Sequence, residues 1–193
     1  MSKKFYLTTF GCRTNQADSA AIRASFFSRG FEEADNPGRA DVIVVNSCTV
    51  THRSDQQVRQ LTRKLRRGNP EAQLVVTGCY AQRVPRTLAQ VAGVDIVAGN
   101  THKSELVRLV SSRLETRWDP LEQRREADVF CDSFSKARTF EVTSTRHLGG
   151  RTRPFVKIQD GCDAGCSYCV VPAVRGPSRS APPEQVVREV REL

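Results

Sequence analysis

Several features of secreted and membrane proteins are missing from this 193-residue sequence. No apolar run approaches the roughly 20 residues that a helix needs to cross a bilayer. The short apolar run after Met1–Lys4 contains threonines and has no small-residue cleavage site of the kind that ends an export signal. Aromatic residues make up only 7% of the chain, and no aromatic platform for stacking RNA bases is evident. These absences predict a soluble, cytoplasmic protein that does not associate with membranes.

Acidic residues are outnumbered, because 30 Lys and Arg against 21 Asp and Glu give a net charge of +9. A charge of this sign favours a polyanionic partner, although it also suits a basic soluble protein that binds no polyanion. The chain has seven cysteines, an odd number, and no export signal. Thiols stay reduced in the cytosol, so this count argues against a disulfide framework and for metal binding or redox chemistry.

Apolar segments alternate with helical patterns through residues 1–114, which we take as the first domain. The segments 5–10, 41–45, 73–77 and 94–98 predict strands, and helices are expected over 16–29, 54–67 and 104–113. The strands are apolar throughout, so both faces of their sheet must be covered. The pattern predicts an α/β fold with a mainly parallel sheet, Rossmann-like or flavodoxin-like.

The composition changes near residue 115. Residues 115–153 are charged and rich in Ser and Thr, which predicts a linker containing a strand or two. A strand over 155–159 and a helix from Pro182 to Leu193 predict a second unit over 154–193. These 40 residues are far fewer than the ~200 of a (β/α) barrel. We therefore expect the chain to stop inside its second domain and to have little or no activity alone.

One group of cysteines is compact in sequence. Cys162, Cys166 and Cys169 have the spacing C-x3-C-x2-C, directly after the strand expected over 155–159. Such a loop can bind three irons of a cubane cluster and leave the fourth iron open to another ligand. The alternative is a structural zinc loop, but structural zinc takes four ligands and no fourth ligand lies nearby in the sequence.

Another group of cysteines is dispersed. Cys12, Cys48 and Cys79 each follow the carboxyl end of a predicted parallel strand. Those ends lie along one edge of an α/β sheet, where ligands bind. Taken singly, each cysteine would more commonly be a small buried hydrophobe, but three at equivalent strand ends predict a shared metal site. Cys131 has no such setting and is expected not to be a ligand.

Together, the two cysteine groups in this order resemble the methylthiotransferases, a family of radical S-adenosylmethionine enzymes. The resemblance includes the segment Gly161–Cys169, the following Val170-Val171-Pro172, and Arg175-Gly176. It implies a three-cysteine domain, then a radical (β/α) barrel, and then an RNA-binding domain. It also implies one [4Fe–4S] cluster on each group, S-adenosylmethionine on the Cys162–Cys169 cluster, and Tyr168 against its adenine.

Residues 11–16, 46–53 and 175–180 look most like the branch that acts on N6-threonylcarbamoyladenosine at position 37 of tRNA. That branch inserts a methylthio group at C2 of the base and uses S-adenosylmethionine twice. The resemblance implies three partners: the anticodon stem-loop of tRNA, an electron-donor protein and a sulfur source. Alternatives are a methylthiotransferase acting on isopentenyladenosine or on a ribosomal protein, and a non-catalytic iron–sulfur or metal-binding fragment.

Basic residues are candidates for contact with tRNA. On the helix 54–67, Arg59, Arg63 and Arg66 or Arg67 are spaced to share one face, although a solvated helix face explains this pattern equally well. A second basic group precedes the radical segment and consists of Arg138, Arg146, Arg151 and Arg153. His52 and His147 are expected to be surface or structural residues. A radical abstraction needs no general base at the reacting carbon, so no acid–base catalyst is assigned.

Overall fold

The computed structural model describes residues 2–115, 126–134 and 155–192. A six-stranded sheet forms from β1 (Lys4–Thr9), β2 (Glu32–Glu33), β3 (Val42–Ser47), β4 (Gln73–Gly78), β5 (Ile96–Ala98) and β6 (Asp128–Phe130). The strand order is β2-β1-β3-β4-β5-β6, and every neighbouring pair is parallel. The first five strands have the flavodoxin-like order. The predicted α/β fold with a parallel sheet is confirmed.

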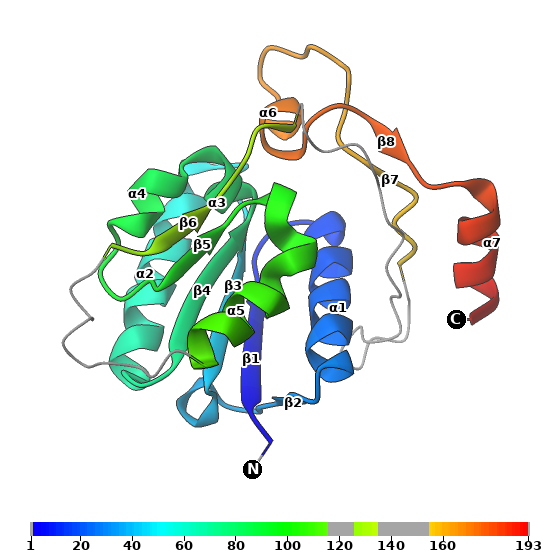
Figure 1. Ribbon diagram of the computed structural model, residues 1–193. Coiled ribbons are helices and arrows are strands. Elements are labelled where there is room, and N and C mark those ends of the chain that lie inside the picture. Colours follow the sequence, from blue (N-terminus) through cyan, green and yellow to red (C-terminus); the bar gives the residue numbers. More distant parts are fainter. Residues whose placement is uncertain (1, 116–125, 135–154, 193) are drawn as a thin grey trace.

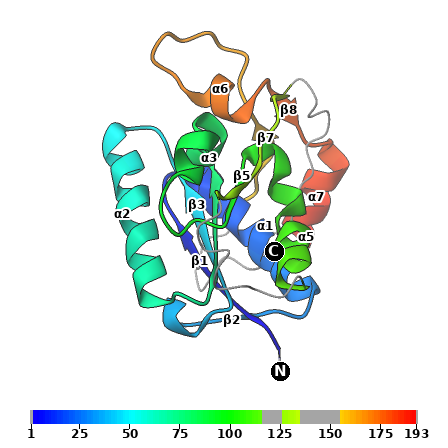
Figure 2. The same cartoon turned by 60° about the vertical axis from the view of Figure 1, so that its left-hand side comes forward.

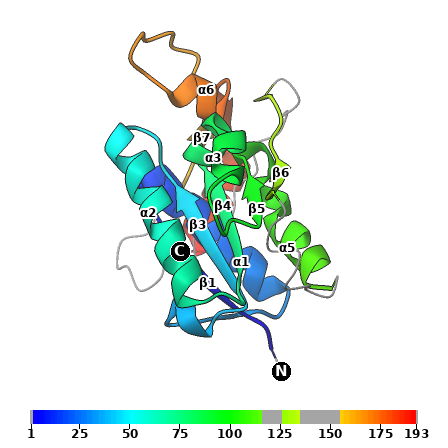
Figure 3. The same ribbon diagram turned by 90° about the vertical axis from the view of Figure 1, so that its left-hand side faces the viewer.

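Helices cover both faces of the sheet (Figure 1). One face carries α1 (Arg13–Ser28) and α5 (Leu106–Glu115), and the other carries α2 (His52–Gly68), α3 (Cys79–Arg83) and α4 (Pro85–Ala89), according to the two core clusters that their side chains join. Figure 3 shows α2 and α5 on opposite sides of the sheet. Two short 3-10 helices, η1 (Pro37–Arg39) and η2 (Asn100–Glu105), complete this part. The predicted elements lie within a few residues of these bounds. Helix α1 begins three residues earlier than expected, directly after Cys12.

The apolar strands bury both of their faces, as their composition predicts. On β3, Ile43 belongs to the same cluster as Val58 of α2, whereas the adjacent Val44 belongs to the cluster that contains Phe26 of α1. Successive side chains of a strand point to opposite faces, so a continuous apolar run supplies two cores at once. The central strands β3 and β4 are buried at every residue. They form a rigid base for the loops and helices at their carboxyl ends.

Strand β6 lies inside the segment predicted as a linker with a strand or two. It pairs with β5 in the register Ile96↔Asp128, Val97↔Val129 and Ala98↔Phe130. Residues beyond the first 114 therefore complete the sheet of the amino-terminal part.

Among the described residues, no helix is both long and apolar enough to span a membrane.

The segment 155–192 carries β7 (Gln159–Asp160), α6 (Val171–Arg175), β8 (Arg179–Ser180) and α7 (Pro183–Glu192). The strand predicted over 155–159 is wrong for residues 155–158, which lie outside any strand. The strand is shorter than predicted because its antiparallel partner, β8, pairs with it over only two residues. The helix predicted after Pro182 is confirmed as α7.

Candidate functional site

The three dispersed cysteines lie at one edge of the sheet. Cys12 follows β1 and is the N-cap of α1, Cys48 follows β3, and Cys79 follows β4 as the first residue of α3. These strands are direct neighbours in the order β1-β3-β4. Their carboxyl ends lie at the end of the molecule where α3 and α6 are found, opposite the N-terminus (Figure 2). The strand order thus brings Cys12, Cys48 and Cys79, which we call the edge cysteines, to one region.

A glycine allows the first two edge cysteines to approach each other. Gly11 has a φ of +109°, and a Cβ on it would lie 2.8 Å from Cys48 Cβ and 3.0 Å from Cys48 Sγ. Only glycine adopts such a φ without strain, and only a missing side chain leaves that space. Gly78, just before Cys79, also has a positive φ, of +95°.

The thiols of the edge cysteines are free and interact electrostatically. Burial raises the pKa of Cys48, and the negative charges of ionised Cys79 and Cys12 raise it further. Burial also acts against ionisation of Cys12, but hydrogen bonds from Asn15 and Thr14 outweigh it and lower the pKa of Cys12. A bound metal would remove the mutual repulsion, because metal ligation deprotonates thiols and shares their charge.

Two amide side chains surround the sulfur of Cys79. Asn15 Oδ1 lies 3.8 Å from Cys79 Sγ, and Asn100 Nδ2 lies 3.7 Å from it. Asn15 is fixed because its Nδ2 donates to the carbonyl of Phe10 at 2.7 Å and to that of Ser47 at 3.0 Å. It therefore ties the ends of β1 and β3 together. Hydrogen bonds to cysteine sulfur are one way in which proteins adjust the potential of an iron–sulfur cluster.

The edge cysteines fit an iron–sulfur cluster by their chemistry. Three thiols are the soft donors that such clusters use, and two buried polar atoms near Cys79, Asn100 Oδ1 and Thr77 Oγ1, have no hydrogen-bond partner in the described structure. Within residues 2–115, 126–134 and 155–192, no three His, Cys, Asp or Glu side chains are grouped closely enough for a single metal ion. A cubane cluster binds each cysteine through a different iron, so its thiols stand farther apart than the ligands of one ion.

The compact group, Cys162, Cys166 and Cys169, lies on a loop between β7 and α6 and is called here the loop cysteines. The loop extends beyond the carboxyl edge of the sheet (Figure 1). Its base is closed by Cys162 N, which donates to Gly176 O at 3.1 Å, and Cys169 N donates to Cys166 O at 3.0 Å. Cys166 is exposed, and Tyr168 is 90% exposed. Three thiols on an open loop fit a cluster that keeps one iron available to a further ligand.

A buried ionic network connects the two cysteine groups, and sequence reasoning missed it. Asp18 of α1 accepts hydrogen bonds from Lys103, Lys157 and Arg175 at 2.7 to 2.8 Å. Burial acts to raise the pKa of Asp18, but the charges of Lys103, Arg175 and Lys157 outweigh it and hold the pKa far below its usual range. A signal existed in the sequence. Asn15, Asp18 and Ser19 are polar at helical spacing on a buried face of α1.

Two of the arginines predicted to share one face of α2 are engaged in hydrogen bonds within the chain. Arg59 bonds to Tyr80 OH, and Arg66 bonds to Asp95 and, at 2.7 and 2.9 Å, to the carbonyl of Gly93. Long basic side chains can satisfy neighbouring carbonyls as readily as they face solvent. Arg63 and Arg67 are exposed. The second basic group, Arg138, Arg146, Arg151 and Arg153, lies outside the described residues, as does His147.

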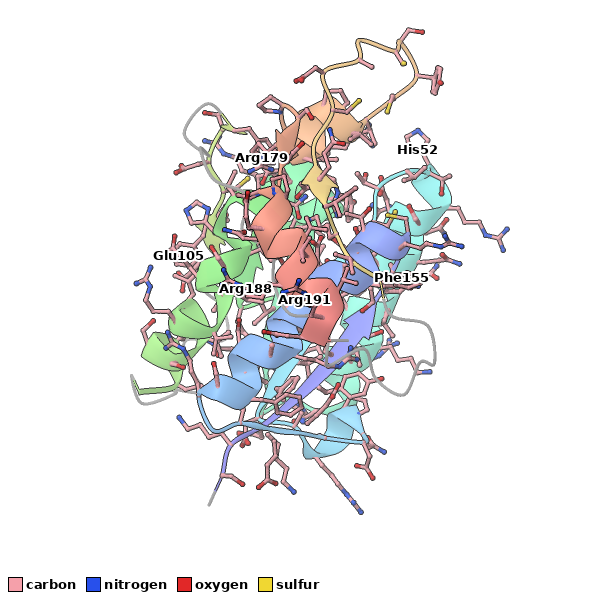
Figure 4. All side chains as sticks on the ribbon, turned by 90° about the vertical axis from the view of Figure 1, so that its right-hand side faces the viewer. His52, Glu105, Phe155, Arg179, Arg188 and Arg191 are labelled. Atoms are coloured by element: carbon pink, nitrogen blue, oxygen red, sulfur yellow. The ribbon has the colours of Figure 1, made fainter. Side chains whose placement is uncertain are left out.

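Two further candidates, His52 and Cys131, follow the carboxyl ends of β3 and β6. His52 is exposed at the first position of α2, as Figure 4 shows. Cys131 is half-buried, and its thiol lies 3.8 Å from the carbonyl oxygen of Gln82. Cys131 directly follows the parallel strand β6, so the expectation that it lacks a strand-end setting is wrong, although β5 lies between its strand and β4, which carries Cys79. That Cys131 is not a ligand stays a prediction, as does the surface or structural role of His52.

Known proteins are similar to this chain in sequence. Residues 4–99 match the uncharacterized protein family UPF0004. The threonylcarbamoyladenosine tRNA methylthiotransferase MtaB of Aquifex aeolicus is 39% identical over 98% of this chain and 44% of its own length. The enzyme of that name from Bacillus subtilis is 35% identical over 96% of this chain and 39% of its own length. The tRNA-2-methylthio-N(6)-dimethylallyladenosine synthase of Aquifex aeolicus is 33% identical over 100% of this chain and 43% of its own length.

The chain has a flavodoxin-like domain with three cysteines at its sheet edge, followed by a C-x3-C-x2-C loop. Together with these similarities, this arrangement defines the class of protein: the chain belongs to the methylthiotransferase family. Within one organism, Aquifex aeolicus, its identity is higher to the threonylcarbamoyladenosine enzyme, at 39%, than to the dimethylallyladenosine enzyme, at 33%. This agrees with the branch expected from the residues around Cys12 and Cys48. The chain spans less than half the length of these relatives.

Proposed function

We propose that this chain is part of a tRNA methylthiotransferase that inserts a methylthio group at C2 of N6-threonylcarbamoyladenosine at position 37 of tRNA. The observation that carries the proposal is the placement of two free cysteine groups at one end of the molecule, one at the sheet edge and one on a neighbouring loop. The similar proteins of Aquifex aeolicus and Bacillus subtilis are named threonylcarbamoyladenosine tRNA methylthiotransferases, and these names support N6-threonylcarbamoyladenosine as the substrate. The divisions at 1–114, 115–153 and 154–193, with a radical barrel beginning in the last, belong to the same proposal, except that β6 (Asp128–Phe130) joins the sheet of the first division.

In this proposal the loop cysteines hold a [4Fe–4S] cluster and the edge cysteines hold a second one. When bound, the cluster on the loop cysteines would, with S-adenosylmethionine, supply the radical chemistry that the unactivated C2–H bond needs, and the cluster on the edge cysteines would supply the sulfur. The chain's own residues hold these groups in place. Asn100 contacts Cys79 Sγ at 3.7 Å, and Tyr168, exposed on its loop, is available to pack against adenine.

Iron content tests the two sites separately. After anaerobic reconstitution, we expect about eight irons per chain, two clusters of four. Cys48→Ala and Cys166→Ala should each bind about half of that iron, because each removes one ligand of a different cluster. Cys131→Ala is the matched control and should retain all of it. A chain that stably binds only zinc would refute both cluster assignments.

Substrate identity is tested in cells by comparing total tRNA nucleosides from strains with and without the gene. We expect 2-methylthio-N6-threonylcarbamoyladenosine to disappear in the deletion strain and to return when the gene is restored. Loss of the methylthio group from isopentenyladenosine instead would move the proposal to the other tRNA branch. Unchanged tRNA nucleosides would refute a tRNA substrate.

A further inference from the structure

The buried ionic network at the sheet edge is larger than folding requires. It consists of Asn15, Asp18, Lys103, Lys157, Asp160 and Arg175, and we call it the edge network. Asp18 is 6% exposed, and Lys157 and Arg175 bond to both Asp18 and Asp160 at 2.7 to 2.8 Å. Replacing a buried ionic group by apolar residues of similar size is often neutral or stabilising. Stability alone therefore does not explain why so many charges are buried here.

Arg175 is the member of the edge network that touches both cysteine regions. Its guanidinium donates to Asn15 Oδ1 at 2.6 Å, to Asp18 Oδ2 at 2.8 Å and to Asp160 Oδ1 at 2.8 Å. Asn15 comes three residues after Cys12 and is bonded to the ends of β1 and β3. Asp160 comes two residues before Cys162. One side chain thus joins the edge that carries the first cysteine group to the base of the loop that carries the second.

A second contact runs parallel to this one. Asn100 of η2, which lies 3.7 Å from Cys79 Sγ, also donates to the carbonyl of Val174 at 2.6 Å. Val174 immediately precedes Arg175 in α6. The backbone of α6 and the side chain of Arg175 therefore both bond to residues beside the edge cysteines. Helix α6 is attached to the sheet edge at two points.

We propose that Arg175 is a positioning residue that fixes the loop cysteines relative to the edge cysteines. The proposal rests on the proposed function, in which each group holds a cluster. A guanidinium is a planar fork that bonds several acceptors in a fixed geometry, which an ammonium group does not reproduce. Sulfur insertion requires one substrate carbon to be reached from both sites, and a misplacement of about 1 Å can cost about 100-fold in rate.

The edge network and the neighbouring Arg179 carry excess positive charge. Lys103, Lys157, Arg175 and Arg179 pair with two carboxylates, Asp18 and Asp160, and these six groups have a net charge of +2 (four minus two). Arg175 and Lys103 both interact electrostatically with Cys79. A positive charge near a cluster stabilises its reduced form, because reduction adds negative charge. Removing Arg175 should therefore make the edge cluster harder to reduce.

The first test needs no metal. Amide hydrogen exchange is measured on the iron-free, thiol-reduced 193-residue chain and on its Arg175→Gln and Arg175→Lys variants. Arg175→Gln should speed exchange at Cys162 and Gly176 by about tenfold or more, because the Cys162 amide closes the base of the loop and the Gly176 amide closes the last turn of α6, which carries Arg175. Arg175→Lys keeps the charge but loses the fork, so an intermediate effect is expected.

Arg23→Gln is the matched control for the exchange measurement. Arg23 forms a half-buried ion pair with Glu33 at 2.7 Å, at the amino end of the sheet, far from the cysteines. It should leave exchange at Cys162 and Gly176 unchanged. Equal exchange in Arg175→Gln and the native chain would overturn the proposal. If Arg175→Gln does not fold, Arg175→Lys decides the question by the same measurement.

The second test uses the reconstituted chain. With both clusters reduced, the magnetic interaction between them, read from the electron paramagnetic resonance spectrum, should change in Arg175→Gln at full iron content. At a fixed potential the ratio of reduced to oxidised edge cluster should fall by about tenfold, which is about 59 mV for one electron. An unchanged spectrum and potential would contradict the positioning role. If the native chain binds no cluster, the proposed function fails, whereas the exchange result still decides what Arg175 does.

Discussion

The edge cysteines and the loop cysteines supply the same donors in the same number, but they reach their positions in different ways. The edge cysteines come from the ends of three parallel strands and meet only because β1, β3 and β4 are neighbours. The loop cysteines lie within eight residues of one another, from Cys162 to Cys169, so covalent spacing alone keeps them together. The first group depends on the tertiary fold, and the second depends on local sequence.

The two groups also differ in burial, although Cys12 at the sheet edge is exposed. Cys48 and Cys79 are 6% and 7% exposed, whereas Cys166 is exposed and Tyr168 beside it is 90% exposed. Two of the three edge thiols are therefore enclosed by their own domain, whereas none of the loop thiols is buried, so a further ligand can approach the loop. The difference matches the two tasks in the proposed reaction, where one site stores sulfur and the other binds S-adenosylmethionine.

The largest expected effect comes from removing the charge at the centre of the edge network. Asp18→Asn should lower the free energy of unfolding by about 3–5 kcal/mol, because three cations lose the carboxylate that holds them. Asp163→Asn is the matched change on the exposed cysteine loop, where Asp163 accepts one hydrogen bond from Ser178 N at 3.0 Å. It should change stability by only about 0.5 kcal/mol. Chemical denaturation of both variants measures the two changes in the free energy of unfolding, and equal losses of stability would contradict the prediction.

The same aspartate gives the edge region a pH dependence. The pKa of Asp18 is lowered in the folded chain, so its stabilisation is present above the unfolded-state pKa of about 3.9 and is lost as the pH falls below it. The native chain should therefore lose stability steeply in acid, and Asp18→Asn should lose the part of that slope that Asp18 contributes. Denaturation midpoints between pH 3 and pH 7 test this, and identical slopes in the two chains would refute it.

Two glycine substitutions, one beside the edge cysteines and one on the cysteine loop, compare the two groups with a smaller expected effect on stability. Gly11→Ala should cost roughly 1–3 kcal/mol, because the new Cβ would strain a positive φ and displace Cys48. It should also weaken iron binding at the edge cysteines. Gly165→Ala on the loop meets nothing within 4 Å and should have no measurable effect on either property. Thermal unfolding and iron content are the measurements, and a Gly165→Ala defect as large as that of Gly11→Ala would break the contrast.

Thiol reactivity gives the mildest test. In the iron-free chain, an alkylating reagent should modify Cys166 at least about tenfold faster than Cys79, because access controls the rate for a buried thiol. Within the edge group, labelling of Cys12 should rise at lower pH than labelling of Cys48, since the pKa of Cys12 is lowered and that of Cys48 is raised by burial. Mass spectrometry of peptides after timed labelling measures both rates, and equal labelling of Cys166 and Cys79 would contradict the burial of Cys79.

Sequence reasoning predicted the central strands well because β3 and β4 contain continuous apolar runs, Val42–Val45 and Leu74–Val76. It also predicted that these strand ends would share one edge, since parallel topology determines that, but the adjacency of β1, β3 and β4 comes from the strand order. The strand expected over residues 155–158 was wrong, because an apolar segment becomes a strand only when a partner of equal length lies beside it. The contacts of Arg175 with Asp18 and Asn15 join residues more than 150 positions apart, and no periodic pattern encodes such a pairing.

Strand β6 determines where a shorter fragment of this protein can end without exposing the sheet. It covers the outer edge of β5, whose residues Ile96–Ala98 are apolar and buried. A fragment cut at residue 114 would leave that edge with unpaired backbone groups, and exposed apolar edges of this kind readily recruit strands from other molecules. Such a fragment should aggregate, whereas one that extends through residue 134 would retain its own edge protection.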